Sequence, residues 1–92
     1  KLMYNLFFTN AFKKDFKLCE KRKLSIPKIE EIFEILATIG NLPPEYKPHK
    51  LSGNYNNCWE CHIEPDWLLI WKYKGSNDIT LIRTGTHSDL FL

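Results

Sequence analysis

The chain has few of the features that mark membrane, disulfide-stabilised or exported proteins. Its longest apolar run, Trp67 to Trp71, is far shorter than the ~18 residues that a membrane span requires. Its three cysteines are an odd number, which argues against a framework of paired disulfides. No basic segment followed by an apolar stretch and a small-residue cleavage site is present. We therefore expect a cytoplasmic protein with no membrane role.

The composition excludes an intrinsically disordered chain. Hydrophobic residues make up 43% of the sequence and aromatic residues 14%, whereas disordered segments are poor in both. A length of 92 residues suffices for one domain with a modest core. We expect residues 1–92 to form that single domain.

The first half of the chain predicts a strand followed by a helical hairpin. Leu2 to Phe8 has the character of a strand, and Thr9 or Asn10 can cap the next helix. That helix carries apolar residues at helical spacing, namely Phe8, Phe12, Phe16 and Cys19. A second helix starts near Pro27, which fits a first turn, and ends at Gly40, which suits the left-handed position after a helix.

The second half of the chain changes to the alternation typical of strands. Three strands are predicted, at Tyr55–Ile63, Asp66–Tyr73 and Ile79–Thr86, and their short connections imply antiparallel pairing. The expected fold is therefore α+β, with an N-terminal strand and a helical hairpin packed on a small antiparallel sheet. The other face of this sheet would be open to a ligand.

Charge is distributed unevenly along the chain. The net charge is +2, but residues 11–23 contain six basic and two acidic side chains, a local +4. The basic residues of this run are Lys13, Lys14, Lys17, Lys21, Arg22 and Lys23. Such a run is either a solvated helix face or a surface that contacts a phosphate backbone.

The motif from Cys58 to His62 matches the C-x-x-C-H pattern of covalent haem attachment. Cys58 and Cys61 lie in a predicted strand, where residues three apart point to opposite faces. They cannot converge on one haem or zinc ion, and no second cysteine pair completes a tetrahedral site. We interpret both cysteines as small apolar residues at a chance spacing, and expect no metal and no cofactor.

A second group of polar residues lies in the latter half of the chain: His49, His62, Asp66, Arg83 and His87. His62 is predicted to point away from the core, and His87 follows Gly85 at the end of the last strand. Each histidine alone would ordinarily be structural or solvated. Several histidines beside an arginine, with Lys47 and Lys50 in a nearby loop, favour a site.

This group suits cleavage of RNA without a metal. The 2′-OH of RNA is the nucleophile, so an enzyme must accept its proton, protonate the leaving 5′-oxygen and stabilise added charge on phosphorus. Histidine can perform either proton transfer near neutral pH. Arginine offers a planar fork of donors to phosphoryl oxygens, and a carboxylate can orient a histidine.

The chain resembles the YafQ branch of the RelE-family toxins over nearly its whole length. The resemblance rests on three tracts: Tyr46-Lys-Pro-His49-Lys-Leu-Ser-Gly53, Glu60-Cys-His62-Ile-Glu-Pro-Asp66-Trp67-Leu-Leu-Ile-Trp71 and Arg83-Thr-Gly-Thr-His87-Ser-Asp-Leu-Phe91. It implies a toxin of a type II toxin–antitoxin system that cuts mRNA in the ribosomal A site without a metal. It also implies a DinJ- or RelB-like antitoxin that wraps the toxin. Operator DNA would be contacted only through this antitoxin.

The resemblance assigns roles to individual residues. His49, His62, Asp66 and His87 match acid–base positions, with His87 the principal group and His49 or His62 its partner. Arg83 matches the arginine that stabilises the phosphate, and Phe91 an aromatic that contacts bases. Further RNA contacts are expected at Lys47, Lys50, Glu60 and Trp67, and ribosome contacts at the basic run from Lys13 to Lys23.

The chain departs from the family pattern at three positions, one of which is Leu92, which extends past the usual final Phe. Glu60 stands where related sequences often have Asp, and Trp59 where a basic residue is common. Two alternatives to a nuclease stay open from the sequence. One is a non-catalytic relative that only binds RNA, the ribosome or a partner protein. The other is a gyrase poison of the ParE group, although such a protein would need no acid–base residues.

Overall fold

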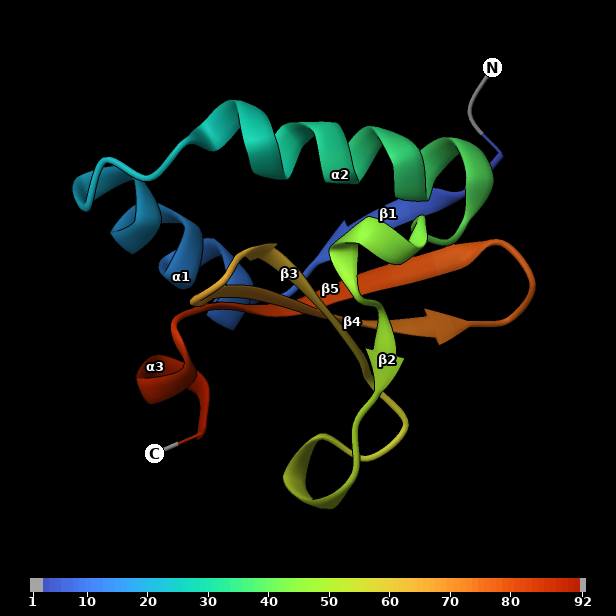
Figure 1. Cartoon of the computed structure of the whole chain (residues 1–92). Helices are drawn as coiled ribbons and strands as arrows, with labels where there is room; N and C mark the ends of the chain where they lie inside the picture. The colour runs from blue at the N-terminus through green and yellow to red at the C-terminus, as the bar shows by residue number, and fades with distance from the viewer. Residues whose placement is uncertain (1–2, 92) are drawn as a thin grey trace.

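A computed structural model describes residues 3–91 and shows two helices covering one face of a five-stranded sheet (Figure 1). The strand order across the sheet is β1-β5-β4-β3-β2. The elements are β1 (Asn5–Phe8), α1 (Asn10–Lys21), α2 (Ile26–Ile39), the short 3-10 helix η1 (Pro44–Tyr46), β2 (His49–Lys50), a second 3-10 helix η2 (Gly53–Tyr55), β3 (Trp59–Glu64), β4 (Trp67–Lys74), β5 (Asp78–Gly85) and α3 (His87–Phe91). The predicted α+β class is confirmed. Within residues 3–91, no helix combines the length and apolar character needed to cross a bilayer.

The first strand, β1, is a member of the sheet, whereas the sequence analysis expected it to pack on the sheet from outside. β1 is an edge strand that runs parallel to β5, with Asn5 opposite Asp78 and Phe8 opposite Leu81. The other strand pairs are antiparallel, as expected. Parallel pairing needs a long crossover connection, and the two helices together with β2, β3 and β4 provide it.

Local side-chain chemistry sets the ends of both long helices. The hydroxyl Oγ1 of Thr9 accepts a hydrogen bond from the Phe12 N–H at 2.9 Å, so Thr9 and not Asn10 caps α1. Pro27 lies in the first turn of α2, and Gly40 follows the helix at φ 89°, as predicted. The ring of Tyr4 occupies the space that a side chain at Gly40 would need, so a larger residue is excluded there.

The segment between α2 and β3 differs from the prediction. The strand expected from Tyr55 begins only at Trp59; Tyr55 ends η2, and Asn56 and Asn57 form a turn. β2 has only two residues, His49 and Lys50, and pairs with β3. Runs this short carry no periodic signal, so the sequence did not reveal the fifth strand.

The strand β4 is buried on both faces and forms the centre of the molecule. Its residues Trp67 to Trp71 alternate between two apolar clusters. Trp67, Leu69 and Trp71 face α1 and α2, where they meet Phe12, Ile29, Ile32 and Leu36. Leu68 and Ile70 face the other way and pack with Cys58 and Leu90.

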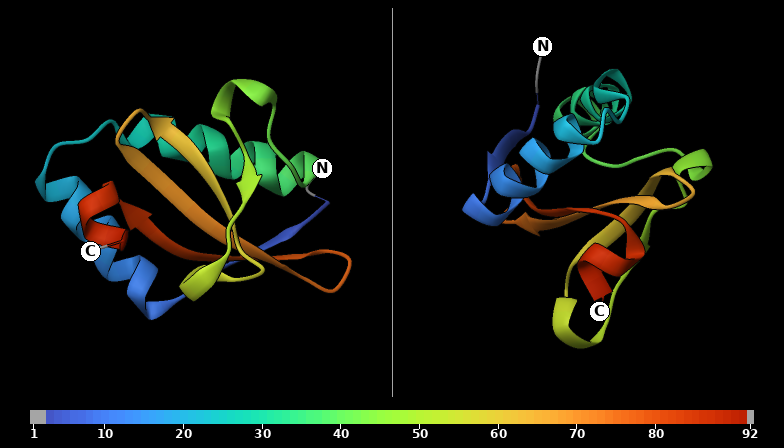
Figure 2. Two further views of the ribbon diagram at one scale, coloured as in Figure 1. Left: turned by 60° about the horizontal axis from the view of Figure 1, so that its bottom comes forward. Right: turned by 90° about the vertical axis from the view of Figure 1, so that its left-hand side faces the viewer.

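The second face of the sheet is therefore partly covered, which corrects the expectation of an open face. Leu90 of α3 and the loop residues Leu51 and Tyr55 pack over Leu68 and Ile70. Figure 2 shows α3 and η2 on the side of the sheet opposite α1 and α2. The apolar residues Cys58, Leu68, Ile70 and Leu90 need this cover because water would otherwise reach them.

The C-terminal helix α3, which was not among the predicted elements, is held by reciprocal capping. The Thr86 N–H donates to Asp89 Oδ2 at 2.9 Å, and the Asp89 N–H donates to Thr86 Oγ1 at 3.1 Å. Arg22, the residue that follows α1, donates to the same Asp89 oxygen at 2.6 Å. Arg22 and the Thr86 N–H hold the pKa of the Asp89 carboxyl well below its usual range. Asp89 thereby ties α3, which carries His87, to α1.

Replacing Asp89 by alanine should release α3 at neutral pH. The cap contributes about 1 kcal/mol to the free energy of unfolding, and solvent screening limits the partly exposed ion pair. Because folding lowers the Asp89 pKa, its contribution is present above the ordinary value of about 3.9 and is lost as the pH falls below it. Urea unfolding at pH 7 and pH 2 should show a difference between wild type and Asp89→Ala that shrinks at the lower pH. Ser88→Ala, an exposed change on the same helix, is the control, and a difference as large at pH 2 as at pH 7 would contradict the assignment.

Candidate active site

Three histidines from three different elements lie in a row across the sheet. His49 is on β2, His62 on β3 and His87 at the start of α3. The ring centres of His49 and His62 are 6.3 Å apart, and those of His62 and His87 are 6.0 Å apart. Strand register produces this row, because Leu68 of β4 pairs with His62 on one side and with Gly85, two residues before His87, on the other.

Asp66 holds His87 in one orientation. Its Oδ1 accepts a hydrogen bond from the His87 backbone N–H at 2.9 Å and lies 2.6 Å from His87 Nδ1. The hydrogen bond from the His87 backbone N–H, and after it the contact with the His87 ring, lower the pKa of the Asp66 carboxyl. Asp66 is therefore a carboxylate that keeps hydrogen on Nδ1 and turns Nε2 of His87 outward.

His62 and His49 have different hydrogen-bonding surroundings. His62 Nδ1 lies 3.3 Å from the carbonyl oxygen of Pro65, and no residue in the described range 3–91 bonds its Nε2. His49 Nδ1 lies 2.9 Å from the Lys47 carbonyl oxygen, and its Nε2 lies 3.0 Å from Glu60 Oε1. In the range 3–91, Nε2 of His62 and Nε2 of His87 have no such neighbour.

Arg83 is bound by an acid that the sequence analysis passed over. Its Nε donates to Asp15 Oδ2 at 2.5 Å, and its Nη2 donates to Asp15 Oδ1 at 3.1 Å. The same carboxylate accepts the Thr84 N–H at 3.1 Å, and the Arg83 pKa is raised by this pairing. Two donors of the predicted phosphate clamp are thus already used. The sequence feature that could have revealed this partner is Asp15 itself, an acidic residue within a lysine-rich segment of α1.

Aromatic rings extend the histidine row at the C-terminal end. The ring centre of Phe91 lies 6.4 Å from that of His87 and 5.5 Å from that of Tyr55. The Tyr55 hydroxyl donates to the Leu90 carbonyl oxygen at 3.2 Å, which helps to fix α3. Phe91 remains 46% exposed and can present a ring face to a nucleobase.

Two residues predicted to bind RNA, Trp67 and Glu60, are buried, so neither side chain is exposed for a direct contact. Trp67 is 1% exposed in the core, where its Nε1 donates to Thr84 Oγ1 at 3.0 Å. Glu60 is 5% exposed and lies on β3 directly opposite His49 of β2. Lys47 and Lys50 are exposed on either side of His49, where RNA could reach them.

The basic run and the cysteines occupy other parts of the molecule. All six basic side chains from Lys13 to Lys23 are exposed on α1 and the following turn, although Arg22 is paired with Asp89. Cys58 lies in the second apolar cluster and Cys61 in the first, on opposite faces of the sheet as expected. Within residues 3–91, no group of three or more His, Cys, Asp and Glu side chains is arranged to hold a metal ion.

Comparisons with known proteins agree over almost the entire chain. The family model described as "Bacterial toxin of type II toxin-antitoxin system, YafQ" matches residues 4–92. The mRNA interferase toxin YafQ of Escherichia coli K12 is 37% identical over 87 residues, which are 91% of each chain. In the E. coli DinJ–YafQ toxin–antitoxin complex, a chain 33% identical superposes with a TM-score of 0.88, covering 99% of this chain and 100% of that one. A metal-bound toxin from Helicobacter pylori, 36% identical, superposes with a TM-score of 0.86 over 97% of this chain and 100% of its own.

Proposed function

Because the chain belongs to the YafQ family of bacterial type II toxins, we propose that it stops translation by cutting mRNA in the ribosomal A site. The observation that carries the proposal is the pair His62 and His87. Their rings lie 6.0 Å apart, and the Nε2 of each has no hydrogen-bond partner among the described residues. A scissile phosphate held between them would have one proton acceptor and one proton donor within reach.

The hydrogen bonds suggest how the two proton transfers are divided. The Asp66 carboxylate compensates the positive charge that His87 carries when both of its nitrogens hold hydrogen. His87 would therefore donate a proton from Nε2 to the leaving 5′-oxygen. His62, whose Nδ1 contacts only a neutral carbonyl, would accept the proton of the 2′-OH. Asp66 orients His87 and stays ionised, so it takes no proton itself.

The remaining groups would bind the RNA around the reacting phosphate. The pair with Asp15 uses Nε and Nη2 of Arg83. Its third nitrogen, Nη1, takes no part in that pair and can donate to a phosphoryl oxygen. Phe91 offers a stacking face to a base beside the phosphate. The ribosome would hold the message in line for attack, and the exposed lysines of α1 would contact ribosomal RNA.

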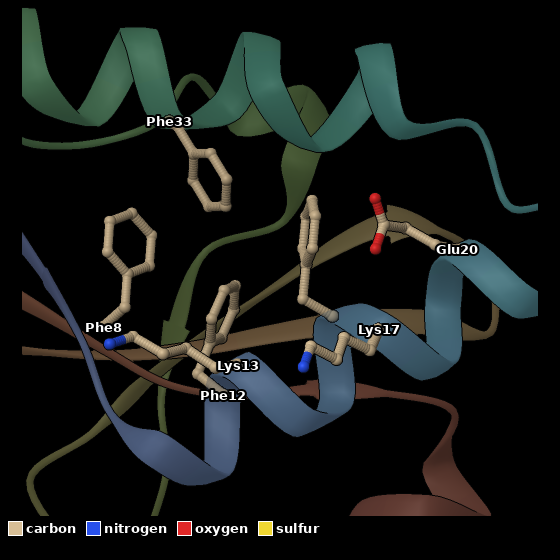
Figure 3. A pocket seen from close by; sticks show the side chains of 7 residues that line it. Phe8, Phe12, Lys13, Lys17, Glu20 and Phe33 are labelled. Atoms are coloured by element: carbon tan, nitrogen blue, oxygen red, sulfur yellow. The ribbon is translucent and has the colours of Figure 1, made fainter.

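An apolar groove between α1 and α2 supports binding of an antitoxin. Figure 3 shows Phe8, Phe12 and Phe33 converging on this groove, with Lys13, Lys17 and Glu20 at its rim. Its volume is about 430 Å³, and Phe8 at its edge is 39% exposed. An exposed aromatic ring packed on further aromatic rings, as Phe8 is on Phe12 and Phe33, is typical of a protein-binding surface.

The charge around the groove indicates the kind of segment that would fill it. Lys13 and Lys17 flank the aromatic floor, in the part of the chain with a local charge of +4. An antitoxin segment with apolar anchors and acidic flanks would complement this surface. The same lysines belong to the proposed ribosome-binding surface, so a segment seated here would also block that contact.

His87→Ala should lower the rate of mRNA cleavage by about 10²- to 10⁴-fold, because it removes one of the two proton transfers. The measurement is the rate of cutting of a message bound to ribosomes, together with growth after induction. Ser88→Ala, the exposed neighbour, should leave both unchanged. Variants at His62, Arg83 and His87 that cut as fast as wild type would refute the site. Ribosome binding by the wild type with no cut message would identify a non-catalytic relative instead.

Cleavage should persist at an undiminished rate in EDTA, because each proposed step uses only side chains of this protein. The comparison matters because the H. pylori relative is described as metal-bound. Ribosomes need Mg²⁺, so the EDTA reaction should contain Mg²⁺ in excess of the chelator. A parallel reaction should use a chelator that is selective for transition metals. Loss of cutting that returns on addition of Zn²⁺ or Cu²⁺ would overturn the metal-free mechanism.

Phe8→Ser should weaken binding of the antitoxin encoded beside this gene by about tenfold or more, or about 1.4 kcal/mol. Phe8 contacts Phe12 and Phe33 at the groove, whereas its neighbour Phe7, 50% exposed, does not line it. Phe7→Ser is therefore the matched control. Calorimetric titration would measure both affinities, and mRNA cleavage by both free toxins should be unchanged. Equal affinities for the two variants would exclude the groove.

A further inference from the structure

A bulge in β5 decides which face of the sheet Arg83 occupies. Ile70 and Trp71 are consecutive on β4, but they pair with Arg83 and Leu81, so Ile82 is an extra residue in β5. Side chains of a regular strand alternate between two faces, and Leu81 belongs to the cluster that faces the helices. Without the extra residue, Arg83 would share that face. With it, Arg83 lies on the face of its partner Ile70, which is the face of the second cluster.

The face that Arg83 gains is the one that carries the proposed reaction. Arg83 precedes Gly85 by two residues on β5, and Gly85 is level with His62 because both pair with Leu68. His87 follows Gly85 directly after the strand. The bulge therefore places the guanidinium near the two histidines and outside the helix-facing core.

The start of α1 is bound to this bulge. The strand β1 ends at Phe8, opposite Leu81, so its pairing with β5 stops before Ile82. The Thr9 hydroxyl donates to the Ile82 carbonyl oxygen at 2.9 Å, and it also accepts the Phe12 N–H that it caps. The residue that caps α1 thus also fixes the extra residue of β5.

Asp15, six residues further along α1, binds the side chain that the bulge has turned. It accepts Arg83 Nε at 2.5 Å, Arg83 Nη2 at 3.1 Å and the Thr84 N–H at 3.1 Å. The Asp15 side chain is 13% exposed and that of Arg83 is 29% exposed, so water screens the pair only in part. A carboxylate that accepts from two nitrogens of the planar guanidinium also fixes its plane. The remaining nitrogen, Nη1, then has a set direction.

We propose that Asp15 is a positioning residue for RNA cleavage, which fixes the Arg83 guanidinium so that Nη1 can donate to the scissile phosphate. This inference rests on the proposed nuclease function and adds a residue of α1 to it. Asp15 itself touches no substrate and transfers no proton. A donor whose direction is fixed beforehand stabilises the charge that develops on phosphorus without reorganising during the reaction.

The first test uses NMR of the free chain and does not depend on cleavage. In wild type, Arg83 Nε–H should exchange slowly with water, and rotation about its Nε–Cζ bond should be hindered, because Asp15 binds two of its nitrogens. In Asp15→Asn, which keeps the shape but loses the charge, rotation should become fast. Arg22, the only other arginine, is bound by Asp89 and should be unchanged. A freely rotating Arg83 in wild type, or one equally hindered in Asp15→Asn, would overturn the proposal.

The second test is a double-mutant cycle in the ribosome cleavage assay. Asp15→Asn should lower the rate at saturating ribosomes by about tenfold or more, without raising the ribosome concentration that gives half the maximal rate. In the Arg83→Ala background the same change should have little effect, because the group through which Asp15 acts is gone. Glu30→Gln, the same loss of charge at an exposed position of α2, should cut as fast as wild type. Equal losses in the two backgrounds would refute a role through Arg83.

Two further controls keep the outcomes separate. The rates are compared at a temperature at which circular dichroism shows every variant folded. If Asp15→Asn does not fold, the rotation of Arg83 in wild type still decides whether its guanidinium is fixed. If wild type cuts no message at all, the proposed nuclease function fails, and the NMR result on Asp15 and Arg83 still stands or falls independently.

Discussion

Burial of β4 on both faces is the constraint on which the rest of the molecule depends. Trp67, Leu69 and Trp71 anchor the helical layer, while Leu68 and Ile70 require a cover on the opposite side. That cover is made by α3 and the loop before β3, the segments that bring His87 and His49 to the site. The same apolar residues thus stabilise the fold and assemble the histidine row, because Leu68 pairs with His62 and with Gly85.

Three aspartates organise the charged side chains around this frame. The two arginines of the chain are both held by carboxylates, Arg22 by Asp89 and Arg83 by Asp15, and Asp66 binds His87. Each contact joins the C-terminal tract to a distant part of the sequence. The net positive charge of the surface is therefore left to lysines, which are mobile point charges suited to phosphate backbones but not to bidentate recognition.

The fold class could be read from the sequence because it rests on local patterns, whereas the histidine group was expected from its residue types and from the family resemblance. Apolar periodicity located α1, α2, β4 and β5, and Thr9, Pro27 and Gly40 marked helix ends. What stayed hidden depends on contacts between distant residues. The parallel pairing of β1 with β5, the Asp15–Arg83 pair and the burial of Glu60 and Trp67 have no local signature. The capping pair Thr86 and Asp89 was visible in the sequence and could have revealed α3.

Gly85 gives the site a genetic consequence. Its φ is 158°, and a Cβ there would lie 2.8 Å from the Asp89 carboxylate that anchors α3. Every coding change away from glycine adds that atom, so any replacement forces the Asp89 side chain, which caps α3, to shift. Cells that survive unchecked production of this protein should hence carry escape mutations in the Gly85 codon more often than its share of the reading frame predicts, although the residue has no side chain and touches no substrate.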